Sequence, residues 1–122
     1  MKSISALVEV MTLVILTASL SACSPSPSLT RNLPADFDVA HKVFDQRIKA
    51  RYPAGSSAAM LVRELSSEGF RPIDVPGPAP ITHWYLFNRD RFPCTDVWYV
   101  TWTADVTNRI TKSAGIYGTA CL

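Results

Sequence analysis

The residues of this chain whose types could support chemistry are a few cysteines and histidines. Cys94 and Cys121 lie in the C-terminal third, and His41 and His83 lie far apart in the sequence. A catalytic thiolate needs an electropositive setting, whereas Cys94 has Asp96 near it and no histidine in its local motif. Two isolated histidines do not predict a metal site. The sequence therefore favours a structural disulfide between Cys94 and Cys121, with no catalytic residue, metal or cofactor.

The sequence gives even less support to the hypothesis that the protein is a hydrolase. Ser56 and Ser57 are the candidate nucleophiles, with His41 or His83 as the base. A nucleophile needs a base and an orienting acid within reach, and no spacing in the chain selects such a set. We therefore expect no enzyme.

The third cysteine ends the stretch Leu20-Ser21-Ala22-Cys23, which follows an uncharged apolar run that begins at Val10. The run has the length of a signal-peptide core, about 7–15 residues, and Lys2 precedes it. The stretch resembles the lipobox of bacterial lipoproteins. That resemblance implies that residues 1–22 are a removed signal peptide and that Cys23 carries the lipid. Glu9 at the edge of the run weakens this reading, and the alternative is an N-terminal membrane anchor that is never cleaved.

Lipid on Cys23 would place the protein at a membrane of the bacterial envelope, because two or more acyl chains hold a protein there stably. Ser24 follows the cysteine, where inner-membrane lipoproteins often have Asp. We therefore expect an outer-membrane lipoprotein that faces the periplasm.

After removal of residues 1–22, we expect the chain to consist of a tether and one domain. Residues 23–33 are rich in Ser and Pro and predict an extended tether, and residues 34–122 predict a single α+β domain. The net charge of +2 gives no support for nucleic-acid binding, which needs a strongly basic face.

Two helices are expected at the start of the domain. The first begins near Asn32 to Asp36 and stops at Tyr52-Pro53, because the residue before proline leaves the α region. Ser56 or Ser57 caps the second, which ends at Gly69. His41 falls within the apolar stripe of the first helix, so we expect it to be partly buried and bonded to a neighbour.

The rest of the domain predicts a sheet. Four prolines make residues 71–80 an extended crossover. Three antiparallel strands follow as a meander, at Ile81 to Phe87, Val97 to Ala104 and Arg109 to about Thr119, with turns at residues 88–91 and 105–108. The fold class is therefore α+β, two helices and three strands (ααβββ) with one disulfide.

The register of the last two strands follows from a three-residue loop that ends in left-handed Asn108. It pairs Ala104 with Ile110 and sets Tyr99 over Gly115. It brings Cys94 opposite Ala120, one residue from Cys121, and a frayed end or a bulge would close that gap. The same register sets Val100 opposite Ala114, Trp98 opposite Ile116 and the misfit Lys112 beside Trp102.

The order of elements resembles a known family. Gly55-Ser56-Ser57 opens the second helix, Leu65-x-x-x-Gly69 ends it, and Trp84-Tyr85 begins the strands. This resembles the small outer-membrane lipoproteins of the SmpA/OmlA (BamE-like) group. The resemblance implies an ααβββ fold and an accessory role in assembling outer-membrane proteins.

Two functions remain open. The first is a non-catalytic envelope lipoprotein that binds a protein partner or supports outer-membrane assembly and integrity. The second is a periplasmic inhibitor or immunity-type lipoprotein that blocks an enzyme or toxin. Tyr and Arg are enriched in interfaces. The candidate contact residues are therefore the tyrosines expected on the second face of the sheet and the arginines of the first turn: Tyr85, Tyr99, Tyr117, Arg89 and Arg91. The alternative, equally open, is that the tyrosines only cover a half-exposed sheet.

Overall fold

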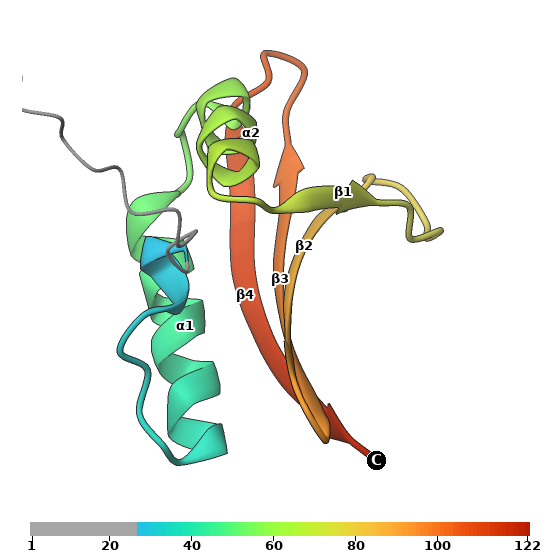
Figure 1. The fold of residues 1–122 in the computed structure, drawn as a ribbon. Helices are drawn as coiled ribbons and strands as arrows, with labels where there is room; N and C mark the ends of the chain where they lie inside the picture. Colours follow the sequence, from blue (N-terminus) through green and yellow to red (C-terminus); the bar gives the residue numbers. More distant parts are fainter. Residues whose placement is uncertain (1–26) are drawn as a thin grey trace, which may run out of the picture.

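The structure is a computed structural model that describes residues 27–122, and the predicted signal peptide and Cys23 lie outside that range. The chain forms two helices and then four strands (Figure 1). In chain order these elements are the 3-10 turn η1 (Ser28–Thr30), α1 (Phe37–Arg51), α2 (Ala58–Ser67), β1 (Arg71–Ile73), β2 (His83–Arg91), β3 (Cys94–Ala104) and β4 (Ile110–Cys121).

The α+β class is confirmed, but the expected number of strands is wrong. The sheet is antiparallel with four strands in the order β1-β2-β3-β4. The additional strand, β1, lies in the proline-rich segment that was expected to be a crossover. It pairs with β2 through Pro72 opposite Tyr85. Proline is tolerated here because β1 is an edge strand, which needs hydrogen-bond donors on one side only.

Both helices begin and end where their capping residues predict. Asp36 caps α1 by accepting a hydrogen bond from the backbone N–H of Val39, and Ser57 caps α2 in the same way. Gly69 ends α2 with a φ of +94°, a conformation that glycine adopts without strain. Phe70 then folds back and is buried against the core.

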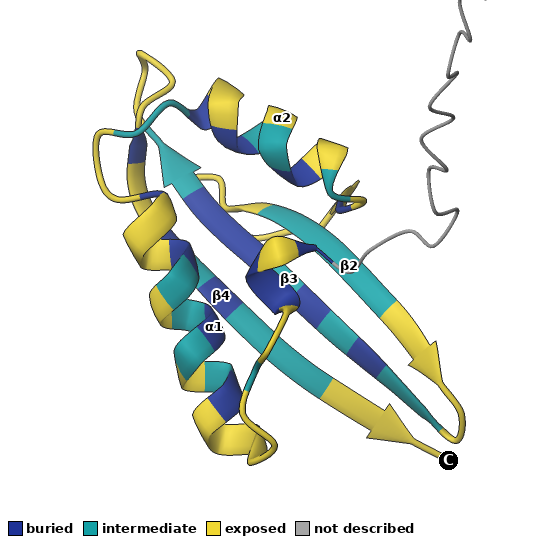
Figure 2. Cartoon of the chain, turned by 60° about the vertical axis from the view of Figure 1, so that its left-hand side comes forward, coloured by how far each residue is buried: buried dark blue, intermediate teal, exposed yellow. Residues whose placement is uncertain are grey.

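The helices cover one face of the sheet, which we call the helical face (Figure 2). Successive strand residues point to opposite faces, so Trp98, Val100 and Trp102 of β3 all point toward the helices. The core between the layers is apolar and closely packed; its most deeply buried side chains are those of Phe44, Ile48, Leu61, Leu65, Val100 and Ile110.

Helix α1 lies directly along β4. Two backbone N–H groups of β4 donate to α1 side chains, Gly115 to Asp45 Oδ1 at 2.9 Å and Tyr117 to His41 Nδ1 at 3.1 Å. These bonds occupy donors at an edge of the sheet that would otherwise be open to pairing with another chain. The expectation that His41 is partly buried and bonded to a neighbour is confirmed.

Asp45 is held in this position as a carboxylate. Burial raises its pKa, but the hydrogen bonds from Lys49 and from the Gly115 N–H outweigh that effect and lower it. Gly115 pairs with Val100 and faces α1, so the expectation that Tyr99 covers it is wrong. The glycine is needed because α1 approaches the strand too closely for a side chain.

The β3–β4 register is as expected at the loop and shifted by one residue beyond it. Asn108 is left-handed with a φ of 59°, and Ala104 pairs with Ile110. A bulge between Thr103 and Ala104 then absorbs one residue of β4. Lys112 consequently pairs with Thr103 and points away from the helices, which removes the misfit beside Trp102.

The packed part of the chain begins earlier than the domain boundary expected at residue 34. Leu29 of η1 is 7% exposed and belongs to the core. Arg47 of α1 donates to the backbone carbonyls of Leu29, Arg31 and Asn32. Ser28 donates to Glu68 Oε1 at 2.6 Å. The packed part of the chain therefore begins by Pro27, and residues 23–26 of the expected tether lie outside the described range.

Candidate functional site

The candidate contact tyrosines do not share one face of the sheet. Tyr85 and Tyr117 lie on the helical face, where their rings pack against Trp102 and Trp98 at 5.2 and 5.3 Å. Both are partly buried against the core. Their expected position on the second face is wrong: the β3–β4 bulge pairs Tyr117 with Trp98, and Tyr85 pairs with Val100, so both share the face of these core residues.

Tyr99 does lie on the second face, which we call the open face. No helix of residues 27–122 covers it (Figure 1). The Tyr99 ring meets Trp84 edge-on at 5.8 Å. Apolar side chains of neighbouring strands surround this pair, and the pairing places Leu86, Val97 and Ile116 among them. The open face is therefore an apolar, half-exposed surface.

Arg89 and Arg91 lie on a strand and not in a turn. β2 continues through the residues expected to turn, and the chain reverses at Phe92-Pro93 instead. Arg91 pairs directly with Cys94, so the loop between the two strands has two residues, Phe92 and Pro93. The expected turn at residues 88–91 is therefore wrong, since the turn lies at residues 92–93.

A carboxylate on β3 organises this end of the sheet. Asp96 accepts from Arg91 Nε and Nη2, both at 3.2 Å, and from the hydroxyl of Thr119 at 2.9 Å. The hydrogen bonds from Arg91, followed by that from Thr119, lower the pKa of Asp96 despite its burial. The network ties β2, β3 and β4 together through one ionised group.

The disulfide lies at the same end. Cys94 and Cys121 are strand partners, and their sulfurs are bonded. The backbone N–H of Leu122 donates to Pro93 O at 3.0 Å. The predicted disulfide is confirmed, and the one-residue gap in its expected register is closed by the bulge in β4.

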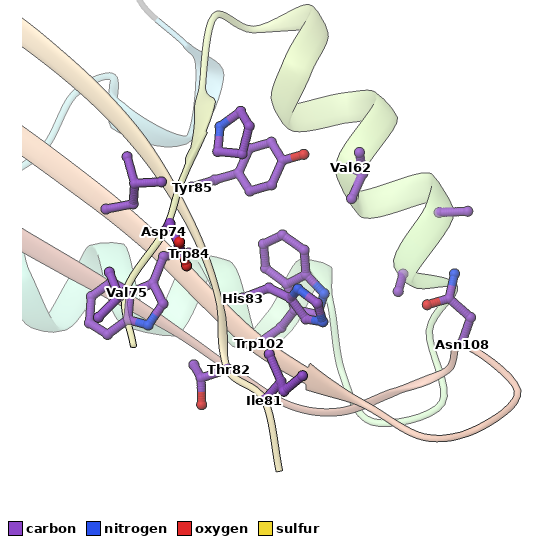
Figure 3. A pocket seen from close by; sticks show the side chains of 14 residues that line it. Val62, Asp74, Val75, Ile81, Thr82, His83, Trp84, Tyr85, Trp102 and Asn108 are labelled. Carbon is purple, nitrogen blue, oxygen red and sulfur yellow. The ribbon is translucent and has the colours of Figure 1, made fainter. Parts of the chain in front are cut away.

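A groove opens at the opposite end of the helical face, between α2, β1 and the start of β2 (Figure 3). Its volume is about 480 Å³. The His83 ring stacks on Trp102 at 5.3 Å, and Val62 of α2 lies across from Tyr85. The lining is mostly apolar, with Asp74 and Asn108 among its few polar side chains. Such a groove can hold an apolar side chain.

The residues weighed for catalysis are used in the fold. Ser57 caps α2 and Ser56 donates to the carbonyl of Pro53. His41 accepts from the backbone of β4, and His83 stacks on an indole. Within residues 27–122 no group of three or more potential metal ligands is found. The part of the chain that the structure describes has no helix long and apolar enough to cross a membrane.

One candidate was missed by reasoning from the sequence. Phe92 is 88% exposed at the turn between β2 and β3. The signal available in the sequence was the dipeptide Phe92-Pro93 between Arg91 and Cys94, because proline marks turns and a large apolar residue there packs against nothing. The turn was placed a few residues earlier, so Phe92 was not weighed.

No family model, curated protein or solved structure matches this chain.

Proposed function

We propose that this protein is a non-catalytic lipoprotein of the bacterial envelope, anchored through Cys23, that binds a protein partner. The resemblance to the SmpA/OmlA (BamE-like) lipoproteins supports an accessory role in outer-membrane assembly or integrity. The small stapled domain supports an exported protein, because disulfides persist in oxidising compartments.

The observation that carries the proposal is the packing of the chain immediately after the lipobox-like stretch. Leu29 is buried in the core and Pro27 is buried as well. Cys23 lies four residues before Pro27, and four residues span at most about 14 Å. Lipid on Cys23 would therefore hold the domain close against the membrane.

This connection also orients the domain. Residue 27 enters on the helical face, where η1 lies between α1 and α2 (Figure 2). For the open face to lie against the membrane, the chain between Pro27 and the lipid would have to pass the helical layer, about 10–12 Å thick, and then the sheet. That path is longer than the about 14 Å that four residues can span. The open face would then point away from the membrane, toward the periplasm, with Tyr99 and Trp84 accessible to a partner.

Intact-mass measurement of the native protein tests the anchor. We expect loss of residues 1–22, lipid added at Cys23, and a mass about two daltons lower than that of the dithiol form. Crosslinking in the native envelope tests the partner. An unlipidated N-terminus, or the absence of any protein neighbour, would refute the proposal.

The alternative is an inhibitor or immunity-type lipoprotein that blocks a periplasmic enzyme or toxin. The projecting, disulfide-stapled turn at Phe92 favours it, because a rigid turn can enter a concave site. The identity of the crosslinked neighbour separates the two functions. An envelope assembly component supports the first, and a hydrolase or toxin supports the second.

A further inference from the structure

The turn between β2 and β3 presents an aromatic ring that the fold does not use. Phe92 is 88% exposed. Among residues 27–122 it takes part in none of the aromatic ring contacts, whereas Phe70 and Phe87 each pack against another ring. A monomeric domain gains nothing from a solvated Phe at this position, since burial is what makes a large apolar side chain stabilising.

A disulfide and two side-chain contacts hold this turn in place. The Cys94–Cys121 disulfide closes its base covalently. On the helical face Asp96 is bound by Arg91, and on the open face the Thr95 hydroxyl donates to Asp90 Oδ1 at 3.2 Å. A side chain held in place before binding loses less conformational freedom when it enters a partner, which raises affinity.

The charged side chains beside the turn indicate which kind of partner surface would fit it. Arg89 is directly opposite Asp96 in the sheet, but Asp96 is engaged by Arg91. Arg89 is exposed and has no hydrogen bond or ion pair within the described part of the chain. The helical side of the turn therefore carries two guanidinium groups against one carboxylate, which leaves the charge of Arg89 unmatched on that side, while the carboxylate of Asp90 lies on the open side.

The turn is continuous with the open face. A hollow of about 420 Å³ lies beside Phe92 and Pro93. Thr95 and Ala120, which are strand partners on the open face, also line it. A partner seated on the turn can therefore extend along the surface proposed above for binding.

We propose that Phe92 is the anchor of a protein–protein interface and that the partner offers an apolar pocket for its ring, with a carboxylate at the pocket rim for Arg89. Tight interfaces concentrate their energy in a few such anchors surrounded by a polar rim. This inference rests on the proposed function and adds the contact surface and the chemistry of the partner.

The test uses the full chain expressed in its native envelope, with the photoreactive residue p-benzoylphenylalanine at position 92. The same residue at Val106, which is 104% exposed at the β3–β4 turn, is the matched control for exposure. A third variant carries it at Tyr99 on the open face. We expect a discrete protein adduct from position 92 and none from position 106.

A second change tests the charge. Arg89→Glu in the position-92 variant should lower the adduct yield by about tenfold or more, because it places like charges together. Arg63→Glu is the matched control, since Arg63 is an exposed arginine of α2 that makes no hydrogen bond or ion pair within residues 27–122. It should leave the yield unchanged. Mapping the adduct should place the crosslinked residue in an apolar pocket next to Asp or Glu.

The outcomes separate this inference from the proposed function. Adducts from position 99 but not from 92 would overturn the inference and leave partner binding standing. A position-92 adduct with phospholipid or with a second copy of this chain would also overturn it. No protein adduct from any position, on a protein whose Cys23 is lipidated, would overturn both.

Binding to the identified partner gives an independent measure. Phe92→Ala should weaken affinity about 30-fold or more, as truncation of an anchor residue does. Val106→Ala should change it less than twofold. Unfolding midpoints of both variants close to that of the unmodified protein would show that the loss comes from the contact and not from misfolding; equal affinities would refute the inference.

Discussion

Substitution of Gly115 by alanine should destabilise the protein far more than its small size suggests. A Cβ atom at this position would lie 2.8 Å from Ile48 Cγ1, 3.0 Å from Phe44 Cδ1 and 3.1 Å from the Cα atom of Asp45. The third contact is with backbone, so rotation of side chains cannot relieve it. Helix α1 would have to move away from β4.

The expected magnitude follows from two effects. Overpacking of a closely packed core costs about 1–3 kcal/mol. Displacing α1 also stretches the hydrogen bond from the Gly115 N–H to Asp45, a bond to a charged group whose partial loss costs about 1 kcal/mol. Together they lower the free energy of unfolding by about 2–4 kcal/mol, against a total of about 5–15 kcal/mol for a domain.

Urea unfolding of the oxidised protein, followed by tryptophan fluorescence, measures this loss. Gly118 supplies the control, because it lies on the same strand and a Cβ there meets nothing within 4 Å. Gly118→Ala should change the free energy of unfolding by less than about 0.5 kcal/mol. The denaturant slope should be the same in all three proteins, so that the midpoints report stability. Equal effects of the two glycine variants would refute the close approach of α1 to β4.

Three further changes test other parts of the structure. Replacing Cys94 and Cys121 together by alanine opens a separation of 27 residues, which in the chain-entropy model lowers stability by about 3.5 kcal/mol; an unchanged unfolding midpoint would contradict this. The folded pKa of Asp96 lies below the usual 3.8, so its contribution to stability is complete above that pH and is lost as the pH falls through the folded value. Asp96→Asn should therefore be less stable than the unmodified protein at pH 6, and the difference should shrink in acid unfolding series below pH 3.8; a constant difference would argue against an ionised Asp96. His41→Ala removes the acceptor of the Tyr117 N–H and should cost about 1–2 kcal/mol, with faster hydrogen exchange of that amide; slow exchange would show that another group protects it.

Local chemistry made much of the fold predictable. Asp36, Ser57 and Gly69 mark the helix ends because capping depends on residues within the same turn. Asn108 marked the last hairpin for a similar reason, since few residues tolerate a left-handed conformation. The disulfide could be inferred because antiparallel pairing from that loop brings the two cysteines near each other.

The errors arose where a choice depends on distant parts of the chain. Proline at position 72 argued against a strand, and only the position of β1 at the sheet edge makes it acceptable. The bulge in β4 changed the face of every residue beyond it, because side chains alternate and a one-residue shift exchanges the faces. Tyr117 was placed on the wrong face for that reason.

The sequence by itself determined the helix limits, the α+β class and the cysteine pair, because each depends on neighbouring residues or on a single loop. Tertiary structure decided which surfaces are free. It buried Leu29 in the core, and it packed Tyr85 and Tyr117 against that core under the helices. It also left Phe92 exposed on a rigid turn, since exposure depends on everything packed around a residue and no local pattern encodes that.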